Sequence, residues 1–591
     1  MRARSEAASP NWRGLCSLIP FALFGVLFVA TRDQWYVPFA DSAREVSVAS
    51  RLADGETLYR DVPYWYGPVP AYLDAFALRA LGKRLDVLVA LRTLLALAGI
   101  EALRRLVRRQ VSDQLLTSGI VATVVSACFF LPNGGSAIFP YSVAALEGMV
   151  GCWVAVALAQ GSRGWASSLA AGVVGGLAAG TKLEFLPAGL LAVAVPLIGS
   201  RPRREAAGAT LLAASLGATA WGLPALALGR ETLVRRGFLV AFVLPEPYRH
   251  LFSSLFWAGG SPRALPARLA VDAAASILFL AFAVLVIRVA GRRGLLGLAA
   301  TFAAGLASAL IPGNRELQLL VPAFFVLLAM AVVSVVRRVG FVSGVQEPRA
   351  LSALGLASLP SALRQPFGFV SSSPYSGFTA AGPLVLSLVI LSSRLALPAA
   401  TGTFLLGLSV AQASGRIKEH RLAPREVIST DRGRVSLYAC EARVVGGLVT
   451  WLQRNAPPGS LVAGVPKPGF VLFLSGHRSP FTEEEWGPIE VDTASSTQAV
   501  ESLSSAPLAA GFTVDRPYLE FGLGAYGHGF GEEIVSALER RMRPVGTIGG
   551  PDRDCPPAAL VDTATLLVPR EFFAAPPPEL ERGGLPSGRR P

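Results

Sequence analysis

The chain has 591 residues, of which 52% are hydrophobic and only 16% are charged, and its mean hydropathy is +0.49. This composition is too apolar for an ordinary soluble protein, and the long apolar runs that recur along the chain predict a polytopic membrane protein. The formal net charge of +14 is concentrated in short arginine clusters between apolar runs, which is the pattern of the positive-inside rule and does not indicate a nucleic-acid partner.

The N-terminus predicts a membrane span that is retained. Arg2, Arg4 and Arg13 precede the apolar run from Leu15 to Ala30, as they would in a signal peptide. The run continues into TRDQWY, which is not a small-residue cleavage site. We therefore expect an uncleaved first span.

Apolar runs predict a helical bundle of about thirteen spans. They lie near residues 15–31, 86–106, 112–131, 140–160, 165–181, 184–199, 206–228, 267–289, 295–312, 317–336, 350–371, 379–392 and 395–413. Four arginine clusters flank these runs and mark the cytoplasmic side, namely 104–110, 201–205, 291–294 and 337–349. The N-terminus is then inside, and the chain after Gly415 is outside. The runs at 184–199 and 351–370 are short or interrupted, and loss of either one as a span would invert the C-terminal side.

The first external loop, residues 32–85, gathers charged and aromatic residues at the membrane surface. From Phe39 to Leu73 it reads FADSAREVSVASRLADGETLYRDVPYWYGPVPAYL. The stretch DSAREVSVASRLADG predicts a helix in which Ser42 and Glu45 form a capping box and Gly55 supplies the stop. Residues 69–81 predict an interfacial helix before the second span. Six aromatic residues suit the membrane interface, namely Trp35, Tyr36, Tyr59, Tyr64, Trp65 and Tyr66.

Asp41 allows two interpretations. It lies at or just before the start of the predicted helix, where its carboxylate would offset the helix dipole. Alternatively, it is a carboxylate held at the bilayer surface and aimed at a substrate.

After residue 414 the sequence predicts a soluble α/β domain, residues 415–573, followed by a disordered Pro/Gly-rich tail, 574–591. Helices are expected over 441–460 and 532–544, and short strands over 461–481. Of the five cysteines, only Cys440 and Cys555 suit a disulfide outside the cytosol.

Three stretches resemble a known family. FADSAREVSVASRLADGETLYRD, followed by YGPVPAYLDAFALRALG, looks like the first external loop of the GT-C superfamily. These polytopic glycosyltransferases use polyprenyl-phosphate sugars and include the protein O-mannosyltransferase and aminoarabinose-transferase branches. GLAAGTKLEFLPAGLL resembles their G-x-x-x-x-T-K segment and falls on Thr181 and Lys182. The third similarity is a C-terminal soluble domain containing a FLSGHRSPF-like strand and loop.

The resemblance implies an inverting, lipid-carrier-dependent hexosyl- or pentosyltransferase with Asp41 as its catalytic base, because an aspartate early in this loop has that role in the superfamily. Sugar transfer from a phosphate needs a base for the acceptor hydroxyl and cations for the leaving phosphate. Lys182 is expected to bind that phosphate, since an ionisable residue in so apolar a neighbourhood is a functional candidate. Its alternative is a lysine that snorkels to the headgroups.

Four further residues are weaker candidates for substrate binding, namely Arg44, Arg60, Asp61 and Arg315. Loop arginines often meet lipid phosphates instead. Asp61 can cap a turn or pair with Arg60, and Arg315 can form a local pair with Glu316.

The chain departs from the superfamily in one respect that concerns metal. Some branches have a second acidic residue between the third and fourth spans, where this chain reads LPNGGSAIFPYS. The four histidines, His250, His420, His477 and His528, are isolated from one another. We therefore expect no cofactor and no metal, with the polyprenyl-phosphate sugar as donor substrate.

The predicted fold is an all-α membrane bundle with external interfacial helices, joined to a soluble α/β domain. We expect a multi-pass protein of the bacterial inner membrane, with the C-terminal domain external, that glycosylates a lipid, glycan or protein. A non-catalytic transporter or flippase of a lipid-linked sugar is the alternative, although such a protein should carry midplane charges and internal symmetry. A membrane scaffold whose C-terminal domain does the work is the third hypothesis. The residue types specify neither the sugar nor the acceptor.

Overall fold

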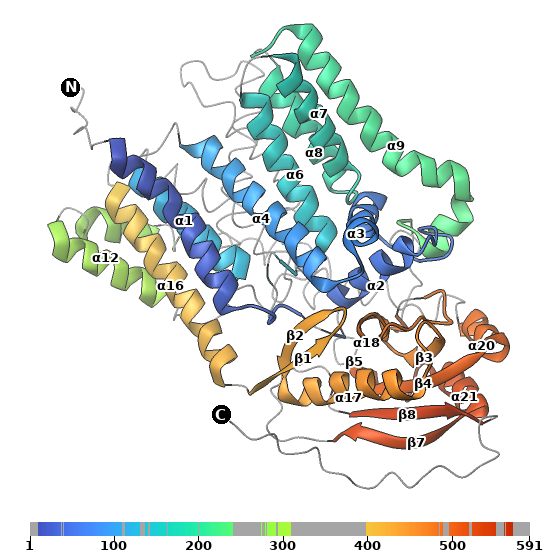
Figure 1. The fold of residues 1–591 in the computed structure, drawn as a ribbon. Helices are drawn as coiled ribbons and strands as arrows, with labels where there is room; N and C mark the ends of the chain where they lie inside the picture. The colour runs from blue at the N-terminus through green and yellow to red at the C-terminus, as the bar shows by residue number, and fades with distance from the viewer. Residues whose placement is uncertain are drawn as a thin grey trace. The chain divides into compact units, whose positions relative to one another are not determined.

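A computed structural model describes most of the chain, and the chain divides into two compact units, Met1–Ala439 and Cys440–Pro591 (Figure 1). The described residues are 10–36, 38–39, 41–108, 113–129, 136, 138–139, 142–161, 164–198, 200–239, 274, 278, 281–290, 293–308, 398–422, 424–483, 485–487, 496–518, 523–550, 561 and 563–570.

The first unit is built from helices. They are α1 (Pro10–Ala30), α2 (Asp41–Ala53), α3 (Pro68–Leu81), α4 (Leu85–Val107), α5 (Asp113–Thr123) with the π-helix η1 (Val124–Phe129), α6 (Val143–Gln160), α7 (Trp165–Ala179), α8 (Phe185–Leu197), α9 (Arg203–Arg236), α12 (Gly294–Ser308) and α16 (Pro398–Leu422). Both helices predicted in the first external loop are present, as α2 and α3.

The predicted spans that fall on described residues are helical, but few of them qualify as spans by themselves. Only α6 and α9, among the residues described, are both long and apolar enough to cross a membrane. Gly229, with φ of 75°, breaks α9 where the predicted span of 206–228 ends. The predicted spans at 317–336, 350–371 and 379–392 lie outside the described residues. The count of about thirteen therefore stays a prediction.

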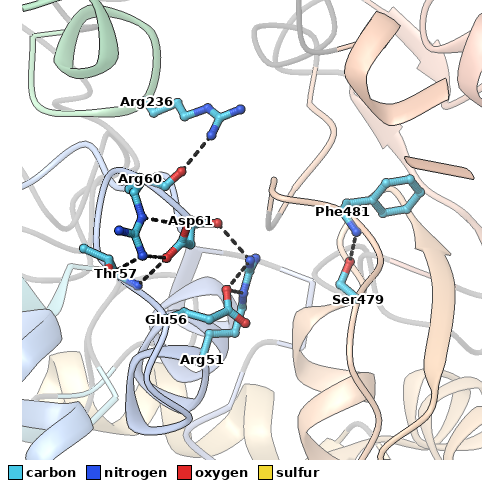
Figure 2. A network of polar contacts seen from close by, with 8 residues as sticks. All are labelled: Arg51, Glu56, Thr57, Arg60, Asp61, Arg236, Ser479 and Phe481. Carbon is cyan, nitrogen blue, oxygen red and sulfur yellow. Dashed lines mark hydrogen bonds and ion pairs between the residues drawn. The ribbon is translucent and has the colours of Figure 1, made fainter. Parts of the chain in front are cut away.

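The first external loop packs onto the end of α9. Tyr59 and Tyr64 of the loop share a buried apolar cluster with Trp221 and Phe238. The backbone N–H of Tyr64 donates to the carbonyl of Arg236 at 2.9 Å, and the Arg236 guanidinium donates to the carbonyl of Arg60 at 2.7 Å (Figure 2). Apolar packing and hydrogen bonds therefore both attach the loop to the end of α9.

The turn that precedes α3 lies directly against the turn between α7 and α8. The N–H of Gly67 donates to the carbonyl of Thr181 at 2.8 Å, and Pro68 occupies the first turn of α3, where its missing N–H costs nothing. A Cβ at position 67 would lie 2.9 Å from the Thr181 oxygen and closer still to the Gly180 oxygen. Trp221 fixes the other side, because its indole N–H donates to the Ala179 carbonyl at 2.8 Å. Only glycine permits this approach.

A β-hairpin follows α16 and belongs to the first unit. Strands β1 (Arg425–Thr430) and β2 (Gly433–Tyr438) pair antiparallel. The N–H of Ser436 donates to the Asp33 carbonyl at 2.7 Å, and the N–H of Leu85 donates to the Arg432 carbonyl at 2.7 Å. Helix α16 also runs past residue 414 without a break. The first compact unit ends at Ala439, whereas the sequence predicts a domain boundary after residue 414.

The second unit is an α/β fold. Its four-stranded sheet has the order β3-β4-β8-β7, in which β3 and β4 are parallel and the other neighbours are antiparallel. The strands are β3 (Leu461–Val465), β4 (Leu508–Asp515), β7 (Met542–Gly549) and β8 (Thr563–Pro569), beside the small pair β5 (Pro517–Tyr518) and β6 (Leu523–Ala525). The helices are α17 (Ala439–Asn455), α18 (Gly469–Ser475), α20 (Ser496–Ser505) and α21 (Glu532–Arg541).

Two predictions for the second unit concern the strands over 461–481 and the disulfide of Cys440. The first is wrong in part, and the second is tested only at Cys440. Short strands were expected throughout 461–481, but only β3 forms there, and the apolar run after Pro468 is the fully buried helix α18. A short apolar run bounded by prolines suits either a buried strand or a buried helix, so periodicity could not separate them. Cys440 is disulfide-bonded, while Cys555, its predicted partner, lies outside the described residues.

Gly67→Ala tests the contact between the two turns. The added methyl meets two backbone oxygens, which cannot move aside as a side chain could, so we expect a loss of about 1–3 kcal/mol or more in stability. The measurement is the midpoint of thermal unfolding in detergent. Gly82→Ala is the matched control for space, since a Cβ there meets nothing within 4 Å, although its φ of 100° adds backbone strain. A Gly67→Ala variant that unfolds like wild type would contradict the close approach.

Candidate active site

Helix α2 places three predicted residues on one face. Its backbone begins at Asp41, whose side chain lies outside the described residues. Arg44 and Glu45 follow three and four residues later, and residues at these spacings are neighbours on a helix surface. The backbone of Asp41 therefore lies one helical turn from Arg44 and Glu45.

Glu45 is a buried carboxylate. It is 3% exposed, and it accepts a hydrogen bond of 2.8 Å from the Tyr64 hydroxyl. A guanidinium nitrogen of Arg44 lies 3.9 Å from its other oxygen. Burial raises the pKa of Glu45 to about 7, although Arg44 and the Tyr64 hydrogen bond oppose this shift. The capping contact expected with Ser42 involves a side chain outside the described residues.

Lys182 and Arg44 meet at one aromatic ring. The Nζ atom of Lys182 lies 4.5 Å from the centre of the Tyr66 ring, and the Arg44 guanidinium carbon lies 5.6 Å from the same centre. Lys182 is 3% exposed and Arg44 is 9% exposed. Lys182 also lies 3.3 Å from a carboxylate oxygen of Glu184. The Y-G-P and G-T-K segments, which are far apart in the sequence, therefore lie side by side.

The structure adds three buried charged residues that sequence reasoning missed. Asp74 of α3 accepts a 2.5 Å hydrogen bond from Arg92 of α4, and the two side chains are 2% and 0% exposed. The Arg92 guanidinium also lies over the Phe139 ring, 4.4 Å from its centre. Glu147 of α6 is 6% exposed, and neither of its oxygens has a hydrogen-bond partner within the described part of the chain.

Glu147 interacts electrostatically with Asp74, Arg92 and Glu45, so it belongs to the same charged cluster. The loop before α6 contains no carboxylate, and Glu147 lies just beyond that loop. A lone charge within an apolar run was the signal that could have identified Glu147, Asp74 and Arg92.

Arg60 and Asp61 lie apart from this cluster, on a turn stabilised by its own contacts (Figure 2). Arg60 donates to both carboxylate oxygens of Asp61, and Asp61 accepts from the N–H of Thr57 at 2.8 Å. Arg51 donates to the Asp61 carbonyl at 2.9 Å. The Arg60 hydrogen bond, with help from Thr57, lowers the pKa of Asp61 to about 2. Asp61 thus caps the turn and pairs with Arg60, which is the structural alternative considered for it.

Two remaining predictions concern residue 315 and metal binding. Arg315 lies outside the described residues. Within the described ranges, no group of three or more His, Cys, Asp and Glu side chains is arranged to hold a metal ion.

Arginines gather at the ends of α4 and α6 that lie away from the site. Arg104 and Arg105 pair with Glu101 in the last turns of α4, about 18 Å along the helix from Arg92 at 1.5 Å per residue. Arg201 reaches the carbonyls of Ala159 and Gly161 at the end of α6. The site and the arginine clusters therefore occupy opposite ends of these helices.

Arg92→Met tests the buried ion pair. The variant leaves Asp74 without its cation beside Glu147, and breaking a buried pair in this way typically costs about 3–5 kcal/mol. We expect a clearly lower midpoint of thermal unfolding. The double variant Asp74→Asn with Arg92→Met removes both charges and should recover part of the loss. A single variant as stable as wild type would show that the pair contributes nothing.

Glu45→Gln tests the burial of that carboxyl. The folded-state pKa of about 7 exceeds the ordinary value of 4.5, so the proton binds the folded state more tightly. Its stabilising effect is complete below pH 4.5 and is lost as the pH rises through 7, by up to about 3 kcal/mol. Glutamine should abolish this pH dependence, measured as the unfolding midpoint from pH 4.5 to pH 8. Parallel pH profiles for the two proteins would contradict the assignment.

No protein-family model matches the chain, and no curated protein sequence matches it. Solved structures with a similar fold include oligosaccharyltransferase AglB from Archaeoglobus fulgidus, in complex with an inhibitory peptide and a dolichol-phosphate. It is 12% identical, with 93% of this chain and 75% of that chain covered and a TM-score of 0.46.

ArnT from Cupriavidus metallidurans bound to undecaprenyl phosphate is 15% identical, with 95% of this chain and 98% of that chain covered and a TM-score of 0.41. Arabinofuranosyltransferase AftD from mycobacteria is also 15% identical, with 95% and 42% covered and a TM-score of 0.39. With all scores below 0.5, the likeness assigns no residue and no activity.

Proposed function

We propose that the chain is a membrane glycosyltransferase that moves a sugar from a polyprenyl-phosphate donor to a hydroxyl of a lipid, glycan or protein. One observation supports this most strongly. Two buried cations from distant segments, Arg44 and Lys182, lie at the Tyr66 ring, and Arg44 follows Asp41 by one turn of α2. An aspartate that takes a proton and cations that bind an anion are the groups needed to transfer a sugar from a phosphate.

The proposed reaction is a single displacement with inversion at the sugar. The acceptor oxygen attacks the anomeric carbon, and the bond from that carbon to the phosphate oxygen breaks. Asp41 takes the proton of the acceptor hydroxyl. The phosphate leaves on its lipid with the bonding electron pair, and Lys182 and Arg44 stabilise the negative charge that develops on it.

The lipid part of the donor explains why the site is surrounded by apolar helices. A polyprenyl chain is as hydrophobic as the membrane interior, so its phosphate must be bound at the surface. Dolichol-phosphate and undecaprenyl phosphate are named with two of the similar structures. Both are polyprenyl phosphates, the class of carrier lipid that we propose for the donor. Arg60, Asp61 and Arg315 stay predicted contacts of the substrate, and no metal is included.

The site is proposed to face outward from the bacterial inner membrane. The arginine clusters at the far ends of α4 and α6 favour the cytoplasmic side by the positive-inside rule, and the site lies at the other ends. On the same rule the second unit is external. A transporter would bind its cargo near the midplane, whereas Glu147 lies in the second turn of α6, near the proposed outer surface.

Asp41→Asn tests the proposed base. Asparagine keeps the size of the side chain and caps a helix nearly as well, but it cannot accept the proton. We expect the rate of transfer to fall on the order of 10²–10⁴-fold, with unchanged thermal stability. The measurement is release of polyprenyl phosphate from a radiolabelled polyprenyl-phosphate sugar in the presence of a membrane extract as acceptor source.

Glu45→Gln is the matched control one helical turn along. At pH 7 this variant should be at least as stable as wild type, and it keeps an acceptor for the Tyr64 hydroxyl. A large loss of rate in Glu45→Gln together with a normal rate in Asp41→Asn would move the base to Glu45. Normal rates in both variants would remove general-base catalysis by α2 from the proposal.

A further inference from the structure

Tyr66 is itself held firmly in place. Its carbonyl accepts a 2.7 Å hydrogen bond from the Tyr59 hydroxyl, and its ring packs edge-on against Tyr64, with 5.4 Å between the ring centres. The N–H of the next residue, Gly67, donates a hydrogen bond to the carbonyl of Thr181. Thr181 directly precedes Lys182. The position of the ring relative to Lys182 is therefore fixed by backbone contacts and not only by the side chains.

An aromatic ring can order cations without cancelling their charge. The ring attracts a cation through its quadrupole, typically by 0.5–2 kcal/mol or more when the pair is away from water. A carboxylate would position the two cations equally well, but it would neutralise one of them. Glu45 and Glu184 lie 3.9 Å and 3.3 Å from Arg44 and Lys182 respectively, so each cation already has an acidic neighbour. The Tyr66 ring brings the two cations to one place without adding a further negative charge.

We propose that Tyr66 is a positioning residue that holds Lys182 and Arg44 together as one site for the phosphate of a lipid carrier, which is a diester in the sugar donor and a monoester after the sugar has left. This inference rests on the proposed function, because it assigns the donor phosphate to these two cations. It adds a residue that does not touch the reacting atoms. The role assigned to Tyr66 depends on the π-electrons of the ring and not on the hydroxyl.

Substitutions of Tyr66 separate the ring from the hydroxyl. Tyr66→Phe keeps the ring and should bind undecaprenyl phosphate within about twofold of wild type. Tyr66→Leu removes the ring and should weaken binding about tenfold, as expected for the loss of two cation–π contacts. Binding is measured on the full chain in nanodiscs. Equal affinities of Tyr66→Leu and wild type would overturn the inference.

A fluorinated ring removes any question of folding. A trifluorinated phenylalanine in place of Tyr66 has nearly the shape of phenylalanine but a much weaker quadrupole. Affinity should fall from Tyr66→Phe to the fluorinated protein with unchanged thermal stability. If the two bind equally well, the ring acts by packing alone and the inference is wrong.

A double-mutant cycle shows whether Tyr66 acts through Lys182. In a Lys182→Ala background, Tyr66→Leu should cost clearly less than its tenfold effect in wild type, because one of its two partners is already absent. Equal effects in both backgrounds would mean that Tyr66 and Lys182 act independently, which contradicts the proposal.

The choice of ligand identifies the source of the phosphate. Undecaprenyl phosphate, phosphatidic acid and inorganic phosphate are compared as competitors, and the carrier is expected to bind most tightly. Equal competition by phosphatidic acid would assign the site to a membrane headgroup and overturn the carrier as its ligand. Failure of wild type to bind undecaprenyl phosphate would instead remove the proposed function, whereas normal binding by wild type and Tyr66→Leu alike would remove only the role of Tyr66.

Discussion

The contact of Gly67 with Gly180 and Thr181 is the constraint on which the rest of the site depends. It brings a loop near the N-terminus against a helix turn more than a hundred residues later, at a distance that only glycine allows. Through this contact Tyr66 reaches Lys182, and through α2 the same ring reaches Arg44. Backbone packing thus brings the segments that carry Tyr66 and Lys182 together.

Buried charge is the second feature of the site, and it has an energetic cost. Asp74, Arg92 and Glu147 come from three helices and are almost wholly removed from water. Charges in such surroundings are expensive unless paired, and pairs of this kind seldom add stability over apolar residues. Their presence next to Glu45 is therefore better explained by chemistry at the site than by stability, which is why they support an enzyme or binding protein over a scaffold.

Much of the local structure could be predicted from the sequence, whereas the site could not. Helices α2 and α3 follow from turn residues and periodicity within the loop itself. The meeting of Tyr66 with Lys182 is a long-range contact, and a single sequence contains no information that pairs them. Glu147 was missed because it lies within an apolar helix, where the sequence alone does not show which face is buried or which charges lie nearby. The run after Pro468 formed α18 because burial, which periodicity does not reveal, decided between helix and strand.

Mass spectrometry of products tests the central claim most directly. Purified protein is incubated with a panel of polyprenyl-phosphate sugars and membrane extract, and both the lipid and the acceptor fractions are analysed. Sugar transfer predicts that one donor yields free polyprenyl phosphate together with an acceptor heavier by one sugar residue. Both products should form far more slowly with Asp41→Asn. Recovery of every donor intact, whether left in place or moved across the bilayer, would contradict a glycosyltransferase.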